Sequence, residues 1–184
     1  MSPPTGTPAV IALGSNLGDR QQNLRSGVKD IGLIDGVTVT AVSDIVESQA
    51  VKPTGTDASA PQYLNAVILV TCDLDPETLL TELNRIETDH GRVRVERWGD
   101  RTLDLDLIAF GTLTHSSVRL TLPHPRAWER SFVIVPWRQI DPEARLAGRG
   151  RIDQLAAART DALWEYNAAT LFADPCEQKI GRSR

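Results

Sequence analysis

Hydrophobic and polar positions along the first 110 residues follow the repeats of four strands and two helices. Apolar and polar residues alternate over 37–46 and 103–107, which is the spacing of strands with one buried face. Residues 9–13 and 63–72 are apolar almost throughout and predict buried strands, the second of them central in its sheet. Over 19–32, apolar residues recur at the three- and four-residue spacing of a helix.

A second helix is predicted over 75–91, because Asp75 is placed to cap its first turn and Pro76 follows at the first helical position. The elements therefore run strand, helix, strand, strand, helix, strand. This order predicts an α+β fold with a ferredoxin-like βαββαβ core, an antiparallel sheet with its helices on one face. We expect a C-terminal extension to follow, with an extended piece and two helical segments at 118–122, 127–140 and 152–158.

Length and composition indicate a single domain over residues 1–184, large enough to bury about 70% of the surface of the unfolded chain. Residues 1–8, rich in Pro and Thr, and the tail 174–184 are expected to be flexible. The net charge of −4 argues against a nucleic-acid-binding protein. The two cysteines lack the spacing of a zinc site and favour a reducing compartment. We find neither a secretory signal nor a membrane span, and we expect a cytoplasmic monomer.

Four arginines directly precede an alternating acidic strand, and this stretch carries the strongest chemical signal in the chain. Asp104 and Asp106 lie two positions apart in 103–107, so both point to one face, about 7 Å apart along the strand. Paired carboxylates suit Mg²⁺, which prefers one or two carboxylates together with phosphate oxygens. Arginine presents a fork of donors that matches phosphate. The stretch predicts a triphosphate site; the alternative is a solvated acidic strand face after a charged loop.

No glycine-rich phosphate loop of the G-x-x-x-x-G-K-[ST] or G-x-G-x-x-G type is present. Phosphate recognition would therefore depend on side chains and metal. The segment Gly14–Asn16 ends a predicted strand just before a helix, where its backbone amides either face an anion or form a plain turn.

Several single residues have both a functional and a structural interpretation. Tyr63 and Asn65 share one strand face and either recognise a flat heterocycle or belong to the core. Trp98, inside the polar arginine stretch, is best explained as closing over a ligand. His124, between two prolines, is either a phosphate donor or part of a rigid turn. Glu87 either orients an arginine or a ribose, or lies on a solvated helix face.

Seven short segments occur in an order that resembles 6-hydroxymethyl-7,8-dihydropterin pyrophosphokinases, a family of folate biosynthesis. The resemblance covers about residues 9–142, and R-T-L-D-L-D is its most specific part. The segments are Gly14–Gly18, Tyr63–Ala66, Gly91–Arg94, Arg97–Gly99, Arg101–Asp106, Leu122–Pro125 and Arg130–Val133. The resemblance implies transfer of the β,γ-diphosphate of ATP to the pterin hydroxymethyl oxygen, with release of AMP.

The resemblance also implies a role for particular residues. Asp104 and Asp106 would hold two Mg²⁺ ions, and Arg92 and Arg101 would neutralise charge that develops during transfer. The residues that would line the ATP site are Asn84, Glu87, Arg94, Arg97, Trp98, Leu107, Arg119, Thr121, His124 and Arg130. The residues that would contact the pterin, with the ring between Tyr63 and Phe132, are Ser48, Ala50, Val51, Tyr63, Asn65 and Phe132.

Two other functions remain open from the sequence. A non-catalytic nucleotide- or RNA-binding module uses aromatic pairs on a similar sheet, but the acidic net charge and the paired aspartates argue against it. A kinase that transfers a single phosphate, or an ATP hydrolase, would use the same metal and arginines. The products separate these functions, since diphosphate transfer releases AMP, monophosphate transfer or hydrolysis releases ADP, and a binding module releases neither.

Overall fold

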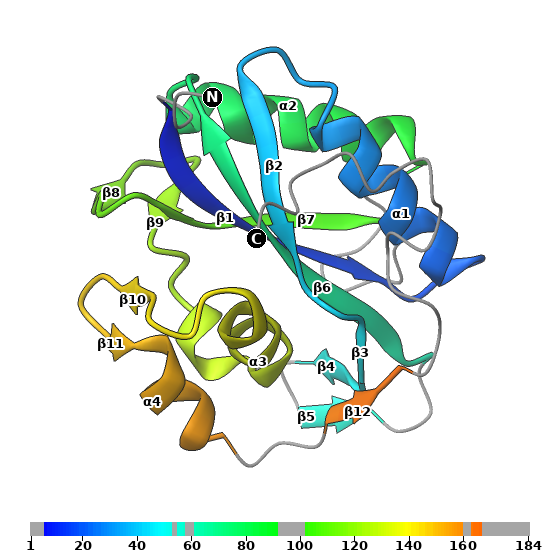
Figure 1. The fold of residues 1–184 in the computed structure, drawn as a ribbon. Helices are drawn as coiled ribbons and strands as arrows, with labels where there is room; N and C mark the ends of the chain where they lie inside the picture. The colour runs from blue at the N-terminus through cyan, green and yellow to red at the C-terminus, as the bar shows by residue number, and fades with distance from the viewer. Residues whose placement is uncertain (1–5, 53–54, 58–60, 92–101, 160–162, 167–184) are drawn as a thin grey trace, which may run out of the picture.

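The fold is an antiparallel sheet with helices on both faces (Figure 1). The structure is a computed structural model and describes residues 6–52, 55–57, 61–91, 102–159 and 163–166. The six-stranded sheet has the order β12-β3-β6-β1-β7, and β2 also pairs with β6. Its strands are β1 (Thr7–Ser15), β2 (Val37–Val42), β3 (Val46–Ser48), β6 (Tyr63–Cys72), β7 (Asp104–Phe110) and β12 (Leu163–Glu165). All pairs in this sheet are antiparallel, as predicted.

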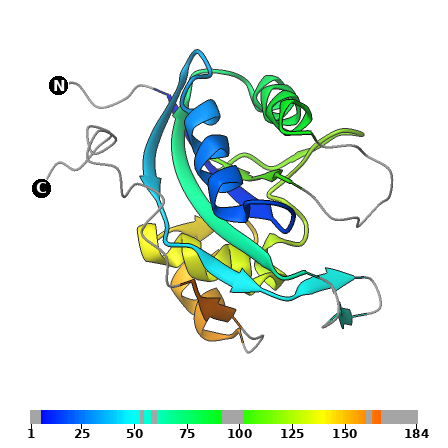
Figure 2. The ribbon, with the colours of Figure 1, turned by 90° about the vertical axis from the view of Figure 1, so that its right-hand side faces the viewer.

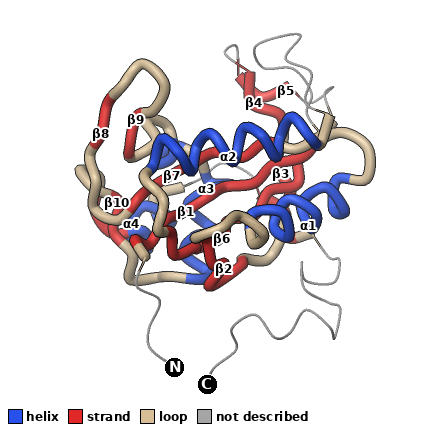
Figure 3. The backbone as a smooth tube through the Cα atoms, turned by 90° about the horizontal axis from the view of Figure 1, so that it is seen from above, coloured by secondary structure: helices blue, strands red, loops and turns tan. Residues whose placement is uncertain are grey.

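The two predicted helices of the core are confirmed. Helix α1 (Arg20–Ile31) begins after Asp19, whose carboxylate accepts a hydrogen bond from the Gln22 backbone N–H at 3.0 Å. Helix α2 (Pro76–Asp89) begins after Asp75, which caps its first turn as predicted. Both helices bury an apolar stripe against the same sheet face, the one that Figure 3 views from the helix side. Its core comprises side chains such as Ile11, Leu13, Leu24, Leu64, Leu79, Leu83 and Leu105.

The two core helices lie on one face of the sheet, as predicted, and two later helices cover the opposite face. Helices α3 (Ser131–Ile140) and α4 (Ile152–Ala157) pack on the opposite face, in the lower half of Figure 1. Val10, Val67 and Ile108 point to that side and form a second core with Ile134 and Trp137. The cause lies in β1 and β6, which are apolar at consecutive positions, so that each presents apolar side chains to both faces.

Strand boundaries differ from the prediction at two places. Strand β1 begins at Thr7, within the segment 1–8 that was expected to be flexible. Thr7 pairs with Cys72 of β6, and Pro8 pairs with Thr71. The strand predicted over 37–46 is two strands, because Ser43 interrupts the ladder. Its backbone N–H donates to the carbonyl of Val67 at 2.9 Å, and its hydroxyl accepts from the Val67 N–H at 2.9 Å. The chain therefore shifts its pairing with β6 between β2 and β3.

The segments expected to be loops contain further short elements. A hairpin of β4 (Ala50–Lys52) and β5 (Gly55–Asp57) continues outward from β3, as Figure 2 shows. Another joins β8 (His115–Ser116) to β9 (Thr121–Leu122). The helix predicted near 127–140 is a 3-10 turn η1 (Ala127–Glu129) followed by α3. A third hairpin, β10 (Arg145–Leu146) with β11 (Gly150–Arg151), precedes α4.

None of the helices in the described part of the chain combines the length and the hydrophobicity that a bilayer crossing requires.

Candidate active site

The register of the sheet brings the predicted metal ligands and pterin residues to one end of the sheet. Gly14 on β1 pairs with Asn65 on one side and with Asp104 on the other. Ser48 on β3 pairs with Tyr63, two residues before Asn65. Residues from four neighbouring strands therefore meet at one end of the sheet, although they are up to 90 positions apart in sequence.

The two aspartates point to the face of the sheet that carries α3. Leu105 and Leu107 are buried in the core under α1 and α2, and successive side chains of a strand alternate between faces. Asp104 and Asp106 consequently lie on the other face, and both are partly exposed. The predicted common orientation of the two carboxylates is confirmed.

Gly14 forms the gap between the predicted pterin residues and the predicted metal ligands. A Cβ atom at this position would lie 3.4 Å from Asn65 Oδ1, 3.6 Å from Tyr63 Cδ1 and 4.0 Å from Asp104 Cβ. The three side chains thus surround a space that no side chain of β1 enters. Gly14 was expected to follow the strand, either with its amide facing an anion or in a plain turn, whereas it belongs to β1. A glycine inside an apolar strand is a signal of close approach that was missed.

The amide of Asn65 is buried and held in one orientation. Its side chain is 5% exposed, and Nδ2 donates to Ser48 Oγ at 2.9 Å and, with longer geometry, to the Tyr63 carbonyl at 3.4 Å. The carbonyl oxygen Oδ1 is the end that faces Gly14. Asn65 therefore directs an acceptor toward Gly14. Ser48, another predicted pterin residue, holds the Asn65 amide in this orientation.

The N-terminus of α3 adds a cation and an aromatic ring next to the aspartates. Arg130 Nη1 lies 3.0 Å from Asp106 Oδ2, and the guanidinium carbon is 5.6 Å from the centre of the Phe132 ring. The structure thus places three predicted site residues in one group. Phe132 is partly buried against the core under α3.

His124 lies beside this group and is held by its backbone. Its N–H donates to the carbonyl of Ile108 at 2.8 Å, and its Nδ1 accepts from the Arg126 backbone N–H at 3.2 Å. Because that partner can only donate, the proton of the neutral imidazole is on Nε2. Burial lowers the pKa of His124, partly opposed by the charges of Asp106 and Asp104. His124 is therefore a neutral donor in a rigid turn, next to the carboxylates.

Glu87 supports the site from the other face of the sheet. Its side chain is 2% exposed, so the alternative of a solvated helix face is wrong. Its Oε1 accepts a hydrogen bond from the Leu105 backbone N–H at 2.7 Å. This contact holds β7 at the residue between Asp104 and Asp106. A direct contact of Glu87 with ATP stays a prediction.

Replacing Glu87 with Ala is expected to lower the free energy of unfolding by about 2–3 kcal/mol, since a buried acceptor is lost and the Leu105 N–H is left unsatisfied. Glu87→Gln keeps an acceptor at the same place and should cost less than half of that. Urea denaturation of both variants measures the difference. Equal losses would mean that the hydrogen bond to β7 is not what stabilises this position.

The remaining predicted ATP residues within the described part of the chain lie on α2 and on the β8–β9 hairpin, except Leu107, which is buried in β7. Asn84 on α2 donates to the carbonyl of Leu80 at 2.8 Å. Arg119, in the hairpin, donates from Nη2 to Thr81 Oγ1 of α2 at 3.2 Å, and Thr121 is exposed on β9. These residues form a second group, away from the pterin side.

The predicted arginines Arg92, Arg94, Arg97 and Arg101, together with Trp98, lie outside the described residues. Ala50 and Val51 belong to β4, but their side chains are not described. The residues that flank the arginine stretch are joined, since Thr102 Oγ1 donates to the His90 carbonyl at 2.6 Å. His90 Nε2 in turn lies 2.7 Å from Asp30 Oδ2 at the end of α1.

The donor set fits Mg²⁺ bound together with a phosphate ligand. Among the described residues, no group of three or more His, Cys, Asp or Glu side chains could hold a metal ion by itself. Asp104 and Asp106 supply two carboxylates on one face, which is the number that Mg²⁺ takes when phosphate oxygens complete its shell. The site is therefore suited to a metal–nucleotide complex rather than to a permanent metal cage.

Comparison with known proteins identifies relatives over most of the chain. The family model described as 7,8-dihydro-6-hydroxymethylpterin-pyrophosphokinase (HPPK) matches residues 10–142. A Bacillus subtilis protein named 2-amino-4-hydroxy-6-hydroxymethyldihydropteridine pyrophosphokinase is 42% identical over 132 residues, which are 72% of this chain and 77% of the relative. The Haemophilus influenzae protein of the same name is 39% identical over 153 residues, 83% of this chain and 93% of the relative.

Solved structures share the fold. A Plasmodium falciparum HPPK-DHPS structure with pterin and p-hydroxybenzoate superposes on 85% of this chain with a TM-score of 0.65 at 13% identity. The chain spans 44% of the length of that solved protein, so the likeness concerns one part of it. From the family match and the relatives of similar length, this chain belongs to the 7,8-dihydro-6-hydroxymethylpterin-pyrophosphokinase family.

Proposed function

We propose that this protein transfers the β,γ-diphosphate of ATP to the hydroxymethyl oxygen of 6-hydroxymethyl-7,8-dihydropterin, giving the pterin diphosphate and AMP, in folate biosynthesis. The observation that carries the proposal is the position of Gly14 between Asn65 and Asp104. A residue suited to recognise a heterocycle and a residue suited to hold Mg²⁺ are separated by one strand. A pterin and the phosphates of ATP bound to these two residues would be neighbours.

The pterin would lie over Gly14. A flat ring could approach the backbone there because Gly14 itself has no side chain. Asn65 Oδ1 would accept a hydrogen bond from a ring N–H group, while Ser48 holds the amide in place. Tyr63 and Phe132 would enclose the ring, and Ala50 and Val51 would contact its edge through the backbone.

The triphosphate would lie on the α3 side of β7. Asp104 and Asp106 would hold two Mg²⁺ ions, which supply charge neutralisation to the phosphates when bound. Arg130 is already paired with Asp106, so it is placed to contact a phosphate that joins them. His124, neutral and with its proton on Nε2, would add a donor without adding charge.

The nucleotide would extend along β7, which is the outermost strand on its side of the sheet. Leu107 of β7, Asn84 and Glu87 of α2, and Arg119 and Thr121 of the hairpin would surround it. Arg92 and Arg101 would neutralise charge that develops during transfer. Arg94 and Arg97 would bind phosphates, and Trp98 would cover the bound substrates.

Catalysis would depend on position and electrostatics. Transfer of a phosphoryl group requires little covalent chemistry from the protein, so orientation and charge stabilisation provide most of the rate enhancement. The chain would hold the pterin alcohol in line with the β-phosphorus, exclude water, and place guanidinium groups around the phosphate oxygens. We assign no general base, because a stabilised leaving group lowers the demand for one.

We further infer that the core is a ferredoxin-like fold. The order β7-β1-β6-β2, with α1 following β1 and α2 following β6, supports this assignment. The segments from β8 to β12 form the C-terminal extension. The net charge of −4 and the scarcity of cysteine favour a cytoplasmic monomer that binds small molecules and no nucleic acid.

Product analysis tests the proposed reaction. The protein is incubated with ATP, Mg²⁺ and 6-hydroxymethyl-7,8-dihydropterin, and the nucleotide products are separated by chromatography. We expect AMP and pterin diphosphate in equal amounts, and no AMP when the pterin is omitted or Mg²⁺ is chelated. Release of ADP would indicate hydrolysis or monophosphate transfer, and unchanged ATP would indicate a binding module.

Arg20 is a residue that sequence reasoning missed, and we expect it to affect the pterin side alone. Its Nη1 donates to Glu47 Oε1 and to the Gln62 carbonyl, each at 2.8 Å, and so fastens the residues next to Ser48 and Tyr63. Arg20→Ala should raise the KM for the pterin about fivefold and leave the KM for ATP unchanged. Steady-state kinetics with each substrate varied in turn measures this; Arg25→Ala, on the same helix, is the matched control.

A further inference from the structure

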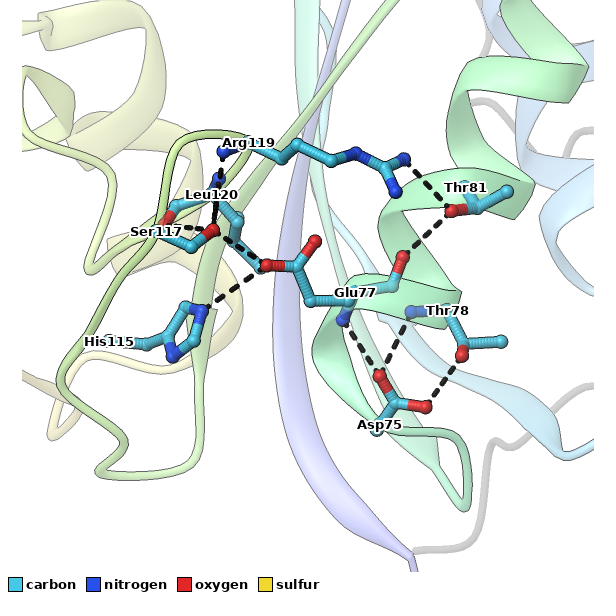
Figure 4. A network of polar contacts seen from close by, with 8 residues as sticks. All are labelled: Asp75, Glu77, Thr78, Thr81, His115, Ser117, Arg119 and Leu120. Carbon is cyan, nitrogen blue, oxygen red and sulfur yellow. Dashed lines mark hydrogen bonds and ion pairs between the residues drawn. The ribbon is translucent and has the colours of Figure 1, made fainter.

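The β8–β9 hairpin is fastened to the beginning of α2 by side-chain contacts that the proposed reaction does not use (Figure 4). Glu77 Oε1 accepts a hydrogen bond from Ser117 Oγ at 2.7 Å and lies 3.3 Å from His115 Nε2. Glu77 belongs to the first turn of α2, whereas both partners belong to the hairpin. The contact therefore joins two separate elements, and we refer to Glu77, His115 and Ser117 as the Glu77 bridge.

Ser117 connects the bridge to the backbone of the hairpin turn. Its hydroxyl oxygen accepts from the backbone N–H groups of Arg119 at 3.2 Å and Leu120 at 3.0 Å. Its own backbone N–H donates to the Leu120 carbonyl at 2.8 Å. The hydroxyl that closes the turn is the same one that donates to Glu77. The position of Glu77 therefore sets the position of the turn that carries Arg119.

The guanidinium of Arg119 is held from the next turn of α2. Nη2 donates to Thr81 Oγ1 at 3.2 Å, and Thr81 Oγ1 donates to the Glu77 backbone carbonyl at 2.9 Å. Both ends of Arg119 are thus connected to one turn of α2: its backbone N–H through Ser117 and its guanidinium through Thr81. A guanidinium has five N–H donors, so contact with Thr81 is compatible with simultaneous binding of an anion.

The base of the hairpin is held by different contacts. Leu120 and Leu122 are 6% and 1% exposed and pack into the core under α1 and α2. The backbone N–H of His124 donates to the Ile108 carbonyl of β7 at 2.8 Å. Loss of the Glu77 bridge would therefore release the turn that carries Arg119 and leave His124 and the aspartates in place.

The Glu77 carboxylate is ionised at neutral pH. Hydrogen bonds from Ser117 and His115, with the positive charge of Arg119, lower the pKa of Glu77 below its ordinary value of 4.5. A lowered pKa in the folded state means that the stabilisation is complete above 4.5 and is lost as the pH falls through the lowered value. Between pH 6 and 8, where an assay would be run, the bridge is intact.

We propose that Glu77 is a positioning residue that holds the hairpin turn so that Arg119 meets ATP, and that it thereby sets the affinity for the nucleotide without touching substrate. This inference rests on the proposed function, because it takes Arg119 and Thr121 as ATP contacts. The Glu77 side chain would contribute through Ser117 and His115, and its backbone carbonyl through Thr81.

Steady-state kinetics of Glu77 variants tests the inference. Glu77→Ala should raise the KM for ATP about tenfold, leave kcat within about twofold, and leave the KM for the pterin unchanged. Glu77→Gln should restore most of the affinity, because its amide oxygen can accept the same hydrogen bond from Ser117. Thr81→Val, which keeps the shape of the side chain and removes its hydroxyl, should raise the KM for ATP by a smaller factor.

Glu82→Ala is the matched control, since Glu82 lies on the same helix and pairs with Arg85 at 2.9 Å, within α2 itself. It should retain the wild-type KM for ATP. If Glu77→Ala behaves like Glu82→Ala, or if the KM values of both substrates rise together, the positioning role is wrong and the proposed reaction stands. If the wild-type protein forms no AMP, the proposed function fails, and the positioning role fails with it.

Discussion

Replacing Asp104 or Asp106 with Asn is expected to lower diphosphate transfer by about 10³-fold or more while the fold remains intact. In the proposed mechanism each carboxylate would help to hold the cations that neutralise the triphosphate, and charge stabilisation of about 4 kcal/mol corresponds to a rate factor of about 10³. The fold should tolerate the change, because both side chains are partly exposed and the ion pair of Asp106 with Arg130 is itself partly exposed to solvent. AMP formation at saturating Mg²⁺ and ATP is the measurement.

The control for these variants is Asp35→Asn, a change of the same kind at an exposed position before β2. All three variants should melt within about 4 °C of the wild type, since none removes an apolar contact. Asp35→Asn should retain full activity. If both the Asp104 and the Asp106 variant turned over near the wild-type rate, these residues would not be the Mg²⁺ ligands, because diphosphate transfer would then not need the pair of carboxylates.

Enlarging Gly14 is expected to weaken pterin binding in proportion to the size of the new side chain. The first added carbon would lie 3.4–4.0 Å from Asn65, Tyr63 and Asp104, ordinary contact distances, so Gly14→Ala should fold. A methyl or isopropyl group there would occupy the space above the backbone that the ring needs. Ala adds one carbon and Val adds three, and misplaced carbons in a binding pocket cost about 1–3 kcal/mol of binding, so the KM for the pterin should rise about tenfold for Ala and about 100-fold for Val.

The KM for ATP separates this effect from a general disturbance of the sheet. It should change by less than about threefold in both variants, because the nucleotide residues lie along β7 and the hairpin. Gly32→Ala is the matched control. Gly32 follows α1 with helical backbone angles, and its added carbon would lie 3.4 Å from the Lys29 carbonyl, away from the site. If both KM values rose equally in the Gly14 variants, Gly14 would not mark the pterin position.

Local sequence signals predicted the elements that carry the site. The apolar run of β6 gave its bounds, Tyr63–Cys72, because turn-forming and charged residues flank it. Asp75 and Pro76 marked the beginning of α2 for the same local reason. Alternation in β7 predicted that both aspartates share a face, since a strand has a fixed period of two.

Relations between distant segments were not predictable from these signals. The position of Gly14 between Asn65 and Asp104 depends on the register of three strands, and no local pattern fixes that register. The strand β12 pairs with the open edge of β3, and nothing in its three residues predicts that partner. Arg20 was missed because its contacts lie 27 and 42 positions away.

One error had a signal that was available. Glu87 lies four residues after Leu83 and so on the buried stripe of α2, yet it was considered for a solvated face because glutamate is seldom buried. Its burial follows from the hydrogen bond that it accepts from Leu105. An acidic residue on an apolar helix stripe therefore predicts a specific partner, here the backbone of the strand that carries Asp104 and Asp106.

The central claim is that Asp104 and Asp106 hold metal ions next to the pterin over Gly14. Paramagnetic relaxation of the pterin protons by Mn²⁺, in a complex with a non-hydrolysable ATP analogue, measures this proximity directly. We expect strong broadening of the pterin resonances in the wild-type protein and its loss in a variant with both aspartates changed to Asn. A tightly bound pterin whose resonances stay sharp in the wild-type protein would contradict the account, because metal and pterin would then occupy separate sites.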